Sequence, residues 1–170
     1  MSLTTLVTFV EVFKINNNNN KSTIHLLQNG KRDPSKTTKQ NANTITFKGK
    51  KFHYLPFVYQ GTTLNRSGDN IESNLVMGNH PISMAKAQTA VANKYFVEVN
   101  VCIMSNDNID NLENILTTDT WLAASLSYDT DVVEILLSSA IDAVGNNIPS
   151  LVLTTEAVGK LPVSSDIQNI

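Results

Sequence analysis

The sequence predicts a mainly β protein with one short helix, arranged as a β-barrel or sandwich. Several short runs rich in Val, Ile, Thr and Phe alternate apolar and polar residues, and turn residues such as Gly, Asn and Pro separate them. One segment alone has helical spacing. Many strands with a single helix are typical of an antiparallel barrel or sandwich against which the helix packs.

The amino-terminal part predicts paired strands. Residues 3–15 and 22–30 form a predicted hairpin around the asparagine run, and the second strand ends at Asn29-Gly30, a favoured turn pair. Residues 44–57 predict two strands around Gly49, with Pro56 ending the second or placing it at a sheet edge. Further short strands should follow, with turns at Gly61, Ser67-Gly68 and Gly78.

The helix is predicted from His80 to Asn93. Pro81 suits the first helical turn, Asn79 is the expected N-cap, and a short apolar face is supplied by Ile82, Met84, Ala85, Val91 and Ala92. The run after the helix alternates strictly and predicts a strand. One face of this strand carries Phe96, Glu98, Asn100 and Cys102, and the other carries Val97, Val99, Val101 and Ile103. Three more strands are expected at 121–129, 132–140 and 150–158.

We therefore expect a single domain over residues 1–160 and an extended carboxy-terminal tail over 161–170. Polar composition predicts long loops at 16–23, 31–44 and 105–119. These loops are candidates for arms that become ordered only on assembly.

Composition excludes several classes of function. Charged residues make up 16% of the chain, the net charge is −2 and the pI is about 5.9, so no surface for gripping nucleic-acid phosphates is expected. The single cysteine, Cys102, excludes an intramolecular disulfide or a thiolate cluster and is interpreted as packing. Without a basic, apolar leader or a long apolar run, we expect a soluble protein made in a reducing compartment.

Catalytic motifs are not found in the sequence. His25, His53 and His80 lack metal-ligand spacing, and no nucleophile elbow, phosphate loop or dinucleotide fingerprint occurs. "RSGDN" could hold an anion through its backbone amides and Arg66, but a glycine turn between strands is favoured. We expect no catalytic, cofactor-binding or metal-binding residues, and hence no enzyme.

The segment "FHYLPFVYQG", residues 52–61, concentrates aromatic residues in a chain that has few of them. Aromatic-rich strands with an embedded proline are typical of sheet edges that a partner strand can pair with. The alternative, that the rings fill the domain's own core, stays equally open. The interface candidates are Phe52, Tyr54, Phe57, Tyr59, Arg66 and Trp121.

Several weak motifs occur in an order that is typical of one family. "FKGKKFHYLPFVYQG", "NRSGDN" and "SNLVMGN" follow the opening strand pair, and "NKYFVEVNVCIM" follows the helix. "DTWLAASLS", "VVEILLSS" and "VGNNIPSLVLTT" complete the order. From about residue 5 to residue 155 the chain therefore resembles the minor tail protein L family of lambda-like siphophages, which are tail-tip or baseplate hub proteins.

The resemblance implies a structural virion protein with a β-domain of the tail-tube or hub type. It implies a homotrimeric ring between a distal tail or tube-end ring protein and a central tail hub or spike protein. Lambda-like members continue into a cysteine-bearing domain with an iron–sulfur cluster; with Cys102 alone, this chain resembles a short form lacking that domain, and no cofactor is expected. It would be made in the host cytoplasm and reside in the virion tail tip, with DNA passing through the lumen without specific binding.

Two alternatives remain open at the level of the sequence. The chain could be a tail tube or tube-completion protein that forms a hexamer. It could also be a carbohydrate-binding β-sandwich in which Tyr54, Phe57, Tyr59 and Trp121 are stacking platforms.

Overall fold

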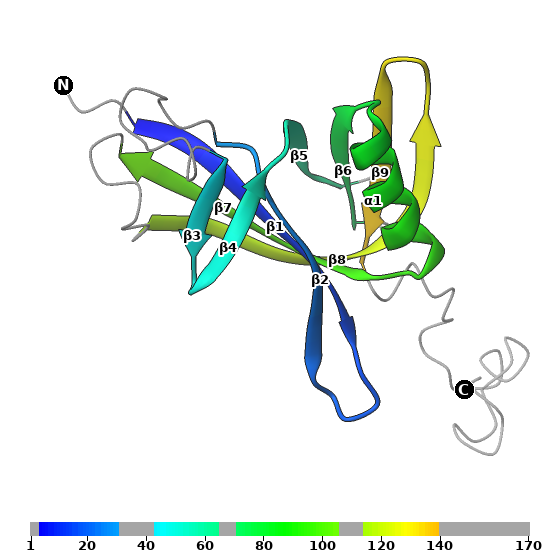
Figure 1. Ribbon diagram of the computed structural model, residues 1–170, viewed down its shortest axis with the longest axis horizontal. Coiled ribbons are helices and arrows are strands. Elements are labelled where there is room, and N and C mark those ends of the chain that lie inside the picture. Colours follow the sequence, from blue (N-terminus) through cyan, green and yellow to red (C-terminus); the bar gives the residue numbers. More distant parts are fainter. Residues whose placement is uncertain (1–3, 31–42, 65–70, 106–113, 140–170) are drawn as a thin grey trace, which may run out of the picture.

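The computed structural model describes residues 4–30, 43–64, 71–105 and 114–139 (Figure 1). In these ranges it contains nine strands and one helix, which confirms a mainly β fold with one short helix. The elements are β1 (Thr4–Ile15), β2 (Lys21–Gln28), β3 (Thr44–Phe47), β4 (Lys50–Tyr54), β5 (Phe57–Leu64), β6 (Ile71–Gly78), α1 (Pro81–Ala92), β7 (Phe96–Ser105), β8 (Asn114–Tyr128) and β9 (Val132–Ser138).

All nine strands belong to one sheet, in the order β3-β4-β2-β1-β7-β8-β9-β6-β5. Neighbouring strands are antiparallel except β2 and β4, which pair in parallel, so the sheet is mixed rather than wholly antiparallel as predicted. The order begins at β3 and ends at β5, and the described residues do not close it, so a barrel is not confirmed. Figure 1 shows β3 and β4 on one side of the molecule and α1 with β6 and β9 on the other, while the β1–β2 hairpin projects away from both.

The β1–β2 hairpin is confirmed, but its loop is shorter than the predicted 16–23. Residues 16–20 form the turn, closed by hydrogen bonds from the Asn16 and Asn19 amides to the carbonyls of Asn20 and Asn16, at 2.9 and 2.8 Å. Asn19 adopts a left-handed φ of 57°, which asparagine tolerates better than most residues. Residues 21–23 already pair with β1, because ladder hydrogen bonds continue to the end of that strand.

The predicted loop at 105–119 is wrong at both ends. Ser105 is the last residue of β7, and residues 114–119 are the first part of β8, paired with β7 from Ile103 to Val99. The β-branched Ile and Thr residues in this stretch suit a pleated strand, and pairing with β7 outweighs its polar composition. Residues 106–113 lie outside the described part of the chain.

Two hydrophobic clusters lie on opposite faces of the sheet. Val10 and Val12 of β1 contribute to the larger cluster with residues of β5–β9 and α1. Val7 and Phe9 contribute to the smaller one, which also contains Cys102 and the side chains of the β3–β4 hairpin: Ile45, Phe47 and Phe52. Because successive side chains of a strand point to opposite faces, β1 supplies both clusters.

Alternation in β7 follows the prediction. Val97 and Val99 belong to the larger cluster, with Val101 packed against it, and Cys102 belongs to the smaller one. Burial raises the pKa of the Cys102 thiol, which fits its interpretation as a packing residue.

Helix α1 begins at Pro81 as predicted, but its cap and part of its apolar face differ from the prediction. Met84 and Val91 pack against the larger cluster as expected, whereas Ala85 and Ala92 are exposed. His80, not Asn79, is the N-cap, and its Nδ1 accepts a hydrogen bond from the Ile82 amide at 3.3 Å. The buried side chains are Ser83, Ala87 and Ala90, small residues that let the helix approach β8 and β9 closely. Ile82, predicted to face the core, is 55% exposed.

Other predictions fall on residues that the structure does not describe. Most of the loop at 31–44, the turn at Ser67-Gly68, the strand at 150–158 and the tail at 161–170 lie outside the described residues, although Thr44 is the first residue of β3. The same holds for Arg66.

Candidate functional site

The aromatic segment contributes chiefly to the core. Phe52, Phe57 and Trp121 are 2%, 6% and 5% exposed, so for these three residues the core alternative is correct and the interface assignment is not. Tyr54 and Tyr59 are half-buried and Arg66 lies outside the described residues. Large apolar rings lose more free energy when exposed than any other side chain, which explains why a β-rich chain with few aromatics buries them.

Pro56 separates the two parts of this segment. Phe52, on β4, packs edge-on against Phe9 and Phe47 with ring centroids 5.1 and 5.9 Å away. Phe57, on β5, belongs to the larger cluster on the other face of the sheet. The proline therefore marks a transfer of the chain between two cores.

Tyr59 and Trp121 form a polar link within the larger cluster. The indole Nε1 donates to Tyr59 Oη at 3.0 Å, and Tyr59 Oη donates to Asp119 Oδ2 at 3.1 Å. Burial, together with the nearby Asp119 carboxylate, raises the pKa of the Tyr59 phenol, so it remains a neutral donor. Since Phe57 and Trp121 are buried and Tyr59 uses its hydroxyl internally, three of the four proposed sugar-stacking rings are not available as an open platform.

A network of charges lies over the face of β1 that carries Phe9. Glu11, whose side chain is only 7% exposed, pairs with Lys50 and, at 3.1 Å, with Lys21. Lys21 also contacts Glu98 of β7 at 2.8 Å, and its Nζ lies 4.0 Å from the centroid of the Phe13 ring. The network thus connects β1, β2, β4 and β7.

Lys48 extends the network to the β3–β4 turn. Its Nζ donates to Asn100 Oδ1 at 2.9 Å and lies 3.7 Å from Glu98 Oε1. Lys48 and Gly49 both have left-handed φ values, 48° and 74°, as a tight hairpin turn of type I′ requires. The turn therefore aims the lysine back at β7.

Burial by itself would raise the pKa of Glu11, but the hydrogen bonds from Lys50, Thr23 and Lys21 together lower it below its ordinary value. The pKa of Glu98 is lowered in the same way, against the effect of burial, by hydrogen bonds from Lys21 and Asn100. Burial opposes the charge of Lys21, yet its contacts with both carboxylates raise its pKa. These groups therefore stay charged at neutral pH and hold the β3–β4 hairpin over the sheet.

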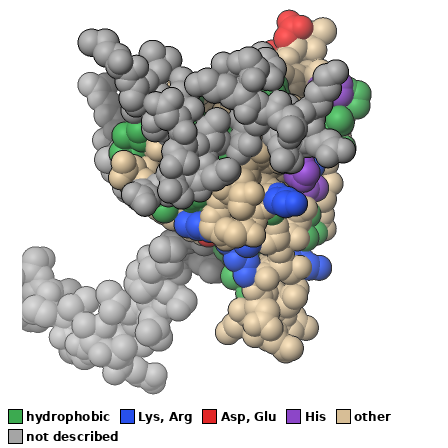
Figure 2. All heavy atoms as spheres, turned by 60° about the vertical axis from the view of Figure 1, so that its left-hand side comes forward, with side chains coloured by type: hydrophobic (Ala, Val, Ile, Leu, Met, Phe, Trp, Pro, Cys, Tyr) green, Lys and Arg blue, Asp and Glu red, His purple; other side chains and the backbone are tan. Residues whose placement is uncertain are grey.

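Sequence reasoning did not identify this network. Its signals were a glutamate inside the apolar run of β1 and a polar pair, Glu98 and Asn100, on one face of β7. Figure 2 shows lysine side chains at separate points on one side of the molecule, with the polar tip of the β1–β2 hairpin projecting below them.

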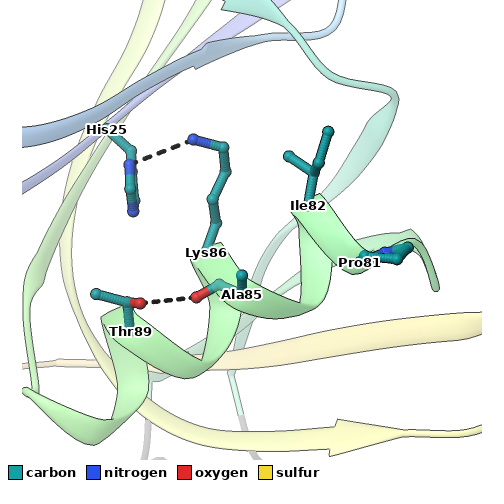
Figure 3. A pocket seen from close by; sticks show the side chains of 6 residues that line it. All are labelled: His25, Pro81, Ile82, Ala85, Lys86 and Thr89. Atoms are coloured by element: carbon teal, nitrogen blue, oxygen red, sulfur yellow. Dashed lines mark hydrogen bonds between the residues drawn. The ribbon is translucent and has the colours of Figure 1, made fainter.

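A groove of about 420 Å³ lies between α1 and β2. We call it the α1–β2 groove; it is lined by His25, Pro81, Ile82, Ala85, Lys86 and Thr89. Figure 3 shows the His25 ring and the Lys86 side chain pointing toward one another across it, with Nδ1 and Nζ 3.3 Å apart. Burial and the Lys86 charge both lower the pKa of His25, so the ring is neutral at neutral pH.

The described residues contain no group of three or more His, Cys, Asp or Glu side chains that could hold a metal ion. The three histidines are separate: His25 lies on β2, His53 on β4 and His80 at the helix start. Among the described residues, no helix is long and apolar enough to cross a membrane.

Comparison with known proteins adds no identification. No protein-family model matches the sequence, and no curated protein is significantly similar to it.

Proposed function

We propose that the chain is a structural subunit of a phage tail tip or baseplate hub. In this proposal it forms a homotrimeric ring that joins the end of the tail tube to a central hub or spike protein. The observation that supports it most is the open sheet: among the described strands, β3 and β5 each have a neighbour on one side only. Open edges are sites where a strand of another subunit can pair.

The β5 edge is suited to such pairing. Its sequence, "FVYQGTTL", contains no charged residue and no proline, the devices with which monomeric proteins usually protect an edge. Pairing with β6 is regular from Phe57 to Gln60, before an irregularity between Gln60 and Thr63. Val58 lies in the regular stretch and is 59% exposed. A neighbouring strand would cover this apolar side chain and the edge amides together.

Three further features support a role in assembly. The weakly charged surface suits broad contacts between subunits, and a weakly acidic chain would not trap DNA that passes through a ring. Leu6 and Leu116 are 62% and 52% exposed on the long strands β1 and β8, so apolar surface is available beyond the β5 edge. The resemblance to the tail protein L family supports the proposed place at the tail tip.

Native mass spectrometry of the full chain tests the proposal. We expect a trimer that forms with increasing protein concentration. A hexamer would favour the tube or tube-completion alternative, and a monomer at every concentration would contradict both.

A substitution on the edge strand tests whether β5 lies in the interface between subunits. Val58→Lys places a charge on the edge and should weaken assembly at least tenfold, because an edge lysine opposes pairing with another strand and would be partly desolvated against that strand's side chains. Asn17→Lys, at the exposed hairpin tip, adds the same charge and should assemble like the unmodified chain. Equal assembly of both variants would exclude the β5 edge from the interface.

A further inference from the structure

The α1–β2 groove combines apolar walls with a positive charge. One side of α1 exposes the apolar residues Pro81, Ile82 and Ala85. The half-buried Lys86 supplies the ammonium group. His25 Nε2 is buried and has no hydrogen-bond partner in the structure. None of the described residues that line the groove is acidic. Its shape and charge therefore suit an apolar side chain that is followed by a carboxylate.

The β8–β9 turn has the complementary chemistry. Tyr128 is 66% exposed at the end of β8, and Asp129 and Asp131 are exposed beside it. The pKa of Asp129 is lowered by hydrogen bonds from the backbone amides of Asp131 and Val132, so its carboxylate is charged at neutral pH.

The turn is also held in a fixed shape. Asp129 Oδ1 accepts the amide hydrogens of Asp131 and Val132 at 2.8 and 2.7 Å. Asn79, just before α1, donates its backbone amide to the Asp131 carbonyl at 2.8 Å and its side-chain amide to the Asp129 carbonyl at 2.6 Å. Docking a turn that is already ordered costs little conformational entropy.

We propose that the β8–β9 turn of one copy docks into the α1–β2 groove of a second copy. Tyr128 would pack on Ile82 and Ala85, and Asp131 would pair with Lys86. The inference rests on the proposed function, since it assigns a contact between subunits of the ring. The turn adjoins the helix start through Asn79, but no residue belongs to both the turn and the groove. A docked copy can therefore still offer one of each, and such a head-to-tail contact propagates until a ring closes.

Charge reversal tests the pairing in the full chain, with sedimentation velocity as the readout. Lys86→Glu and Asp131→Lys should each weaken self-association at least tenfold, because each places like charges together. The double variant Lys86→Glu/Asp131→Lys should regain association to within about threefold, since the pair is restored with reversed sign. Lys51→Glu, an exposed lysine on β4, has the same charge change as Lys86→Glu and should have no effect.

A second measurement does not depend on these charges. Mixing Ile82→Cys and Tyr128→Cys chains under oxidising conditions should yield a disulfide between copies, whereas Asn17→Cys mixed with Ile82→Cys should not. Docking is overturned if the single reversals associate like the unmodified chain, if the double variant does not recover, or if no cross-link forms. If docking is overturned but the unmodified chain still forms trimers, the proposed function is not contradicted. If the unmodified chain stays monomeric, both proposals are contradicted.

Discussion

Glu11→Gln tests whether the charge network holds the β3–β4 hairpin on the sheet. The substitution keeps the shape and an acceptor oxygen but removes the charge that pairs with Lys50 and Lys21. Removing one partner of a fully buried ion pair costs roughly 3–5 kcal/mol of stability. Here the two lysines are 40% and 34% exposed and regain water, so we expect a loss of about 2 kcal/mol in the free energy of unfolding.

Trp121 provides the assay, because it is the single tryptophan of the chain and is 5% exposed. Its fluorescence during urea unfolding reports the free energy of unfolding. In a thermal scan, the melting temperature of Glu11→Gln should be about 6 °C below that of the unmodified chain. Glu98→Gln removes a carboxylate whose side chain is 21% exposed and should cost about 1 kcal/mol. Equal stability of Glu11→Gln and the unmodified chain would refute a stabilising role for the network.

The pH dependence of the free energy of unfolding provides a second test of the contribution of Glu11. The pKa of Glu11 is lower in the folded chain than its ordinary value of 4.5, so its contribution is present above about pH 4.5. It is lost as the pH falls through the folded-state pKa. The free energy of unfolding should therefore decrease as the pH falls below about 4.5, and Glu11→Gln should flatten that decrease; an unchanged slope would contradict the pairing.

Three further substitutions and one control, Gly61→Ala, test the packing by the same unfolding assay. Gly30→Ala should cost about 1–3 kcal/mol, because a Cβ there would lie 2.7 and 2.8 Å from two methyl groups of a buried valine. Gly61→Ala, with no atom within 4 Å of the added Cβ, should be nearly neutral, and equal losses for the two would refute the close approach. Tyr59→Phe should cost about 1–2 kcal/mol by removing the hydroxyl between the indole and a carboxylate, and no loss would refute that link. Phe52→Ala should cost about 3–5 kcal/mol, and less than 1 kcal/mol would contradict its place in the core.

Local signals in the sequence predicted most strands of the fold. Alternation in β7, Gly49 in the β3–β4 turn and Pro81 at the helix start all have causes within a few neighbouring residues. The start of β8 was missed because its composition is polar, and its pairing with β7 outweighs that composition. The parallel pairing of β2 with β4 was missed because Leu27 and His53 are brought together by tertiary structure and not by a local turn.

The candidate sites were harder to predict. The sequence identified the aromatic residues but could not decide between core and interface, because β periodicity gives the face of a strand and not what covers it. The α1–β2 groove depends on Lys86 and His25, which are 61 residues apart and are brought together by tertiary structure alone. Glu11 appeared only as an exception in an apolar run, and its partners come from other strands.

Hydrogen–deuterium exchange at β5 tests most directly whether neighbouring copies complete this sheet. The account predicts that those backbone amides of residues 57–60 that point away from β6 exchange rapidly in the dilute chain and become protected as its oligomer forms, while buried amides of β1 stay protected throughout. Exchange at β5 that does not change when the oligomer forms would contradict it.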